Sequence, residues 1–160
     1  MKQDIMTSGF IILPEQKLIM ENISGLLTIN NITSHRKLLY NHTNFSPDYN
    51  FLLDLRDAKI DITMEQFNAY INHLSSKGNI FKKRKSAFLV KNANQMVFAN
   101  EFKKFEGKIP VETNIFTKLD DAIEWLDLKK WKDIILTHNF RLKSEPEYLW
   151  QNDSDSVSGF

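Results

Sequence analysis

Short apolar runs alternate with segments whose apolar side chains recur at helical spacing. The first run, Phe10–Leu13, is followed by the turn residues Pro14–Lys17 and by a second run, Leu18–Ile23, which together predict a β-hairpin. Phe51–Leu55 is a nearly continuous apolar run, as is usual for a central strand of a parallel sheet that is covered on both faces. The pattern therefore predicts a hairpin followed by a buried central strand.

Helices are predicted where a capping residue precedes apolar positions at helical spacing. Thr28, Thr63 and Asn94 are the expected N-caps. The clearest signal is at Thr63-Met-Glu-Gln66, because this spacing of threonine and glutamine is that of a capping box. The apolar residues that follow it at helical intervals are Phe67, Tyr70, Ile71 and Leu74.

Two further strands are predicted at 85–90 and 111–117, and a closing helix begins at Leu119 and continues through Ile135. The resulting order is ββαβαβαβα, which predicts an α/β fold with right-handed crossovers onto a mixed, mostly parallel sheet of about five strands. Residues 1–140 are expected to form a single domain. Residues 141–160 are expected to be a polar C-terminal tail, because few apolar side chains are available there to offset the entropy of ordering.

Composition narrows the class of protein. The chain has 160 residues, 42% of them apolar, which suits one domain with its own core. Lysine and arginine (21) nearly balance aspartate and glutamate (20), so no overall field favours nucleic acid. There is no cysteine, no stretch of roughly 20 apolar residues that would span a membrane, and no signal-peptide core near the N-terminus. These features predict a cytoplasmic protein that is not membrane-spanning and does not bind nucleic acid.

The segment Asn50–Met64, NFLLDLRDAKIDITM, and the order of elements over residues 8–128 resemble STAS domains. This bacterial family includes the anti-sigma-factor antagonists, such as stage II sporulation protein AA, and the wider set of STAS/Sec14-like proteins. The resemblance implies helices mainly on one face of the sheet and a noncatalytic regulatory module that docks a protein partner. The docking surface is expected to be the loop after the third strand, from Arg56 to Thr63, with the first turn of the following helix. In the family this loop carries an Asp-Ser-Ser-Gly motif whose second serine is phosphorylated by a partner kinase. Here it reads Asp61-Ile-Thr-Met64, so Thr63 stands at the phosphorylated position, and the first serine and the glycine are absent.

Five residues form the predicted partner-binding site: Asp54, Arg56, Asp57, Asp61 and Thr63. The first three lie at the carboxyl end of the central strand, where open α/β sheets usually bind ligands. Alternation places Asp54 and Arg56 on one side, where they could form a pair that organises the loop or could contact a ligand. Thr63 could cap the following helix, be phosphorylated, or do both.

No catalytic, metal or cofactor motif is recognisable. The four histidines lack the spacing that places two ligands on one helix face, and the five glycines form neither a phosphate-binding loop nor a nucleophile elbow. The chain is therefore expected to be neither an enzyme nor a cofactor-binding protein. An alternative function is a carrier or sensor of a small amphiphilic or lipid ligand, held between the sheet and the helix that carries Phe98, Phe102 and Phe105. An open edge strand of the N-terminal hairpin would allow a homodimer, and the sequence does not decide between a monomer and a dimer.

Overall fold

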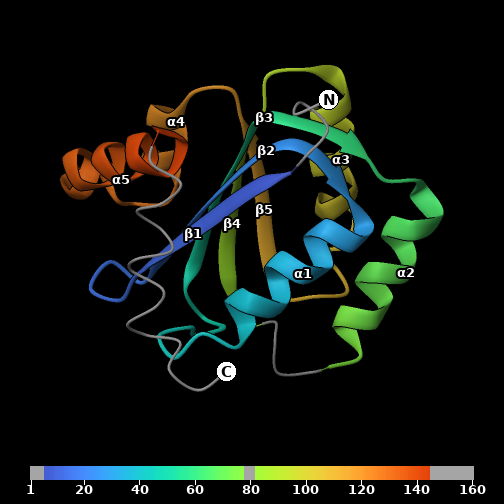
Figure 1. Ribbon diagram of the computed structural model, residues 1–160. Coiled ribbons are helices and arrows are strands. Elements are labelled where there is room, and N and C mark those ends of the chain that lie inside the picture. The colour runs from blue at the N-terminus through green and yellow to red at the C-terminus, as the bar shows by residue number, and fades with distance from the viewer. Residues whose placement is uncertain (1–5, 78–81, 145–160) are drawn as a thin grey trace.

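A five-stranded mixed sheet forms the centre of the molecule in the computed structural model, which describes residues 6–77 and 82–144 (Figure 1). The strands are β1 (Thr7–Leu13), β2 (Leu18–Thr28), β3 (Asn50–Asp61), β4 (Arg84–Leu89) and β5 (Val111–Phe116). They lie side by side in sequence order, with β1 antiparallel to β2 and the other neighbours parallel. The predicted mixed, mostly parallel sheet is confirmed, and β1 is one of its two edge strands.

Helices cover both faces of this sheet, with three of the five on one face (Figure 1). The helices are α1 (Ile29–Tyr40), α2 (Met64–Ser75), α3 (Ala93–Lys103), α4 (Leu119–Trp125) and α5 (Lys132–Ser144), with a short 3-10 helix η2 (Lys129–Trp131). Helices α1, α2 and α3 share one face, and α4 and α5 pack on the other. The predicted single closing helix is divided in two, because Asp127 has a positive φ of 60° that ends the α-helical backbone after α4.

Alternating side chains of the central strands supply the two halves of the core. Leu53 and Leu55 of β3 face α1, α2 and α3, whereas Leu52 faces α4 and α5. All three side chains are at most 2% exposed, as expected for a parallel strand that is covered on both faces. The buried character predicted for this strand is therefore confirmed.

Side-chain caps begin three of the helices. The Thr28 hydroxyl accepts a hydrogen bond from the Asn31 backbone N–H at 3.2 Å, as predicted. The predicted cap at Asn94 is wrong, because α3 begins at Ala93 and the Asn92 side chain accepts from the Gln95 backbone N–H at 3.0 Å. Asn92 follows β4 closely and keeps an extended backbone, which an N-cap requires.

The domain extends beyond the predicted boundary at residue 140. Helix α5 continues to Ser144, and Leu142 is buried in the core together with Ile135, seven residues earlier on the same helix face. Residues 141–144 therefore belong to the domain and not to a tail, while 145–160 lie outside the described residues. No helix within 6–77 and 82–144 has the length and apolar content needed to cross a membrane.

Strand β3 is longer than predicted, and this changes the nature of the predicted docking loop. The stretch from Arg56 to Asp61 was expected to be a loop, but it is strand and pairs in parallel with β2 up to Thr28. Its alternating apolar residues, Ala58 and Ile60, are buried or half-buried on one side. The prediction of a docking loop immediately after the buried run is therefore wrong, and the chain leaves the sheet only after Asp61.

Candidate functional site

The five predicted site residues divide between two places. Asp54, Arg56 and Asp57 lie beside α5 within a network of ionic contacts. Asp61 and Thr63 lie at the far end of β3, where the chain enters α2. The extended course of β3 separates the two groups, so they do not form one continuous surface loop.

Asp54 is the centre of the first group. Its carboxylate is 1% exposed and accepts hydrogen bonds from Arg56 Nε at 3.0 Å and from Arg56 Nη2 at 2.8 Å. The Arg56 backbone N–H donates to the same carboxylate at 3.1 Å. From α5, Lys143 Nζ lies 3.1 Å from Asp54 Oδ2, and Asn139 Nδ2 donates to that oxygen at 3.3 Å. The Asp54–Arg56 pair is thus present within a strand and not in a loop, and its contacts with Lys143 and Asn139 tie α5 to the central strand.

A β-bulge brings Asp57 to the same side of the sheet. Asn22 pairs with Asp54 and Ser24 with Asp57, so β3 contains one more residue than β2 in this interval. Asp57 Oδ2 consequently lies 3.5 Å from Lys143 Nζ, and its other oxygen lies 3.6 Å from Lys91 Nζ. Simple alternation of side chains would have placed Asp57 on the opposite face.

The electrostatics of Asp54 follow from these contacts. Burial alone would raise the pKa of this carboxyl, but the hydrogen bonds from Arg56 and the positive charge of Lys143 outweigh it and hold the pKa below its usual range. Asp54 is therefore ionised at neutral pH, and its acceptor positions are occupied by groups of the protein itself. It is poorly placed to contact a partner.

Thr63 has the capping role predicted from its spacing. Its hydroxyl accepts from the Gln66 backbone N–H at 3.1 Å, and the Gln66 side-chain oxygen accepts from the Thr63 backbone N–H at 3.0 Å. The capping box is complete, and Thr63 is exposed at the N-terminus of α2. Phosphorylation of its hydroxyl stays a prediction.

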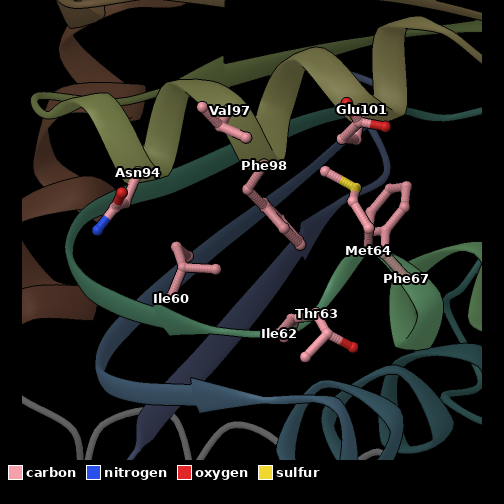
Figure 2. A pocket seen from close by; sticks show the side chains of 9 residues that line it. All are labelled: Ile60, Ile62, Thr63, Met64, Phe67, Asn94, Val97, Phe98 and Glu101. Carbon is pink, nitrogen blue, oxygen red and sulfur yellow. The ribbon is translucent and has the colours of Figure 1, made fainter.

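A pocket opens beside Thr63, between the end of β3, the first turns of α2 and α3 (Figure 2). We call it the α2–α3 pocket, and it has a volume of about 210 Å³. Its lining residues are Ile60, Ile62, Thr63, Met64, Phe67, Asn94, Val97, Phe98 and Glu101. Met64 from α2 and Val97 from α3 are 44% and 53% exposed, so apolar side chains form both sides of the entrance.

Gln95 fixes α3 against the extended part of β3. Strand β4 pairs with β3 only as far as Asp54, so the next backbone carbonyls of β3 have no strand beside them on that side. The Gln95 side chain donates to the Arg56 carbonyl at 3.1 Å and to the Ala58 carbonyl at 2.8 Å, and it is 1% exposed. This contact sets the distance between α3 and β3, and with it the shape of the α2–α3 pocket.

The space between the sheet and α3, where an amphiphile was expected, is filled mainly by aromatic rings. Phe67 of α2 packs edge-to-face on Phe98 and Phe102, with ring centroids 5.5 and 5.0 Å apart. The cavity that reaches Phe102 has a volume of about 20 Å³, close to that of a single water molecule. The phenylalanine stripe therefore belongs to the core, and no observation favours the carrier function at this place.

A second buried ionic cluster was missed by the sequence analysis. Glu21 of β2 is 1% exposed, and its carboxylate lies 2.7 Å from His35 Nε2 and 3.1 Å from Arg36 Nη1 of α1. Burial would raise the pKa of Glu21, but the charge of Arg36 and the hydrogen bond with His35 lower it overall. The signal was a charged residue within the apolar run Leu18–Ile23, since a carboxylate in a buried strand needs a buried partner.

No metal site is apparent in the part of the chain that the structure describes. Within residues 6–77 and 82–144, no three side chains from His, Cys, Asp or Glu gather as the ligands of a metal ion would.

No family model matches the sequence, and no curated protein matches it. Solved structures that are similar to the chain include the following two. One is an uncharacterized protein of the DUF3478 family with a SpoIIAA-like fold from Shewanella loihica PV-4, which has a TM-score of 0.53 and 18% identity over 79% of this chain and 98% of its own. The other is an anti-sigma factor antagonist from Mycobacterium paratuberculosis, with a TM-score of 0.47 and 10% identity over 78% and 96% of the two chains.

The first of these similarities and the order of elements define the class of fold. The chain has the SpoIIAA-like fold, which is the fold of STAS domains, with the ββαβαβαβα order at its core. The fold predicted from the segment Asn50–Met64 is thereby confirmed. At 18% identity the similarity concerns the fold alone, so function has to be argued from the chain's own surface.

Proposed function

We propose that this protein is a noncatalytic binding module that docks another protein at the α2–α3 pocket. The observation that carries the proposal is the pair of exposed apolar residues, Met64 and Val97, on either side of a pocket that lies at the end of β3. Exposed apolar side chains around a concave surface are typical of places that bind a partner. A methionine at the entrance favours docking further, because its flexible side chain adapts to what it contacts.

The size of the pocket favours a side chain of a partner protein over a free ligand. Its volume of about 210 Å³ is below the roughly 300–1,000 Å³ of small-molecule sites. One large apolar side chain is of a suitable size. Such an anchor, surrounded by flatter contacts, is the usual arrangement at the centre of a protein interface.

The charge around the entrance indicates the chemistry of the partner. Asp61 and Glu65 flank Thr63 in sequence and are both exposed. A partner that presents basic residues next to its apolar anchor would complement them. A phosphate on Thr63 would add negative charge at the N-terminus of α2, where the helix dipole stabilises it, and would increase this complementarity. Asp61 and Thr63 are thus retained in the proposed docking surface, whereas Asp54, Arg56 and Asp57 are assigned to the contact between β3 and α5. The module is proposed to act in the cytoplasm.

Capture of the partner from cells of the source organism tests the proposal. The tagged protein is expected to retain a specific protein, and the double variant Met64→Asp/Val97→Asp is expected to lose it, because two carboxylates would have to be desolvated in the interface. The matched control is Leu136→Asp/Phe140→Asp, which places the same charges at two exposed apolar residues of α5, on the other face.

The outcome is decisive if all variants have the far-UV circular dichroism spectrum and melting temperature of a folded protein. Loss of the partner only with the α2–α3 double variant supports the proposed surface. Equal retention by both double variants contradicts it, and so does the absence of any protein above the background of the tag alone.

A further inference from the structure

A second hollow lies on the same face of the sheet, between α1 and the C-terminal half of α2, which run beside each other (Figure 1). We call it the α1–α2 groove, and it has a volume of about 600 Å³. Its lining residues are Thr33, Arg36, Lys37, Tyr40, Asn41, Phe45, Tyr70, His73, Leu74 and Lys77. None of them lines the α2–α3 pocket, so the groove is a separate site.

The charge of this groove differs from that of the whole chain. Arg36, Lys37 and Lys77 are cations at neutral pH, whereas no Asp or Glu is among the described residues that line the groove. The complete sequence is nearly balanced, with 21 basic and 20 acidic residues. A local excess of positive charge in a concave site attracts anions, because low-dielectric walls concentrate the field.

The floor of the groove adds two buried guanidinium groups. A smaller cavity shares Arg36, Tyr40 and Tyr70 with the groove and reaches Arg84 beneath it. Both guanidinium groups lie over the Phe51 ring, Arg84 at 4.0 Å and Arg36 at 5.2 Å from its centroid. Arg36 and Arg84 are each 8% exposed.

Glu21 is a buried acid beside these arginines. Its carboxylate lies 3.1 Å from Arg36 Nη1 and 2.7 Å from His35 Nε2. Burial lowers the pKa of Arg84 to about 10, and Arg36 contributes to the same shift, yet the group stays charged at neutral pH.

We propose that the α1–α2 groove binds a small organic anion, with one carboxylate or phosphate group held by Arg36, Lys37 and Lys77. The flat apolar body of the ligand lies against the aromatic side chains of Tyr40 and Tyr70. The volume of the groove is within the range of about 300–1,000 Å³ for small-molecule sites, and guanidinium and ammonium groups are the usual partners of both head groups. The site is independent of partner docking at the α2–α3 pocket.

Titration followed by nuclear magnetic resonance of the ¹⁵N-labelled full chain tests the proposal. The probes are benzoate and phenyl phosphate, with benzyl alcohol as the neutral analogue and inorganic phosphate as the head group without a body. At least one aromatic anion is expected to shift the amide signals of residues 33–41 and 70–77 saturably, with a Kd of about 1 mM, as is usual for ligands of this size.

Charge reversal at the two exposed lysines provides the critical comparison. Lys37→Glu/Lys77→Glu is expected to weaken binding by about tenfold or more, and the matched variant Lys129→Glu/Lys130→Glu, in η2, is expected to leave it unchanged. All four lysines are exposed, so both variants should fold.

Each outcome has a defined meaning. Preference for benzoate or for phenyl phosphate identifies the head group. The absence of saturable shifts with both aromatic anions overturns the proposal, as does equal binding of benzyl alcohol or unchanged binding by Lys37→Glu/Lys77→Glu. Equal binding of inorganic phosphate and phenyl phosphate overturns the role assigned to the aromatic side chains.

Discussion

The contact between Asp54 and α5 makes a strong prediction about stability. Replacing Asp54 with asparagine keeps the shape of the side chain but removes the charge that Arg56 and Lys143 share. Removing one partner of a buried ion pair costs about 3–5 kcal/mol. The Arg56 and Lys143 side chains are 25% and 28% exposed and can turn partly to water, so we expect a smaller loss of unfolding free energy, about 2–3 kcal/mol.

The pH dependence of this loss follows from the pKa of Asp54. The folded state holds this pKa below its ordinary value of 3.8, so the stabilisation is fully present above that value and disappears as the pH falls through the lowered pKa. The difference in stability between the wild type and Asp54→Asn should therefore be constant from pH 5 to 7 and shrink below about pH 4.

Urea denaturation followed by tryptophan fluorescence measures both effects. The control is Asp57→Asn, whose side chain is 47% exposed and whose loss should cost less than about 1 kcal/mol. A loss below about 0.5 kcal/mol for Asp54→Asn would refute the structural role of the network. Surface substitutions without such a role usually change the unfolding free energy by no more than about 0.5 kcal/mol. A difference that persists unchanged at pH 3 would refute the electrostatic cause.

Substitutions at three further positions test the other supports of the fold, each by urea denaturation. Thr63→Ala should lower the unfolding free energy by about 1 kcal/mol through loss of the cap, and Thr63→Ser should restore most of it. Gln95→Leu should cost about 1–3 kcal/mol, because the Ala58 carbonyl loses its donor, and faster amide exchange at the end of β3 would locate the effect. Glu21→Gln should cost about 3–5 kcal/mol by leaving Arg36 without its carboxylate. A Glu21→Gln protein as stable as the wild type would show that this carboxylate is dispensable.

Local patterns predicted the elements well, because caps and apolar spacing act over a few residues. The Thr63 capping box and the buried strand after Asn50 both have the predicted structure. The end of that strand was misplaced because its last residues are held by pairing with β2. The alternation of Ala58 and Ile60 with polar neighbours was the signal for a strand, but it is short and therefore weak.

The candidate site was predicted less well, because its contacts join residues that are far apart in the sequence. Asp54 was selected for its place at the end of an apolar run, yet Asn139 and Lys143, its partners on α5, are 85 and more residues away, and no local pattern indicates them. Val97 was not singled out, because only the packing of α3 beside Thr63 makes it part of a pocket. Spacing along the chain indicates single elements, and the surfaces between them depend on how the elements pack.

Site-specific photo-crosslinking in cells of the source organism tests the proposed docking most directly. A benzoylphenylalanine residue at Val97 should form a covalent adduct with one partner protein, whereas the same residue at Phe140, also exposed but on α5, should not. Mass spectrometry of the adduct should place the crosslink beside an apolar residue of the partner. Adducts of equal yield from both positions, or a partner that crosslinks only from Phe140, would contradict docking at the α2–α3 pocket.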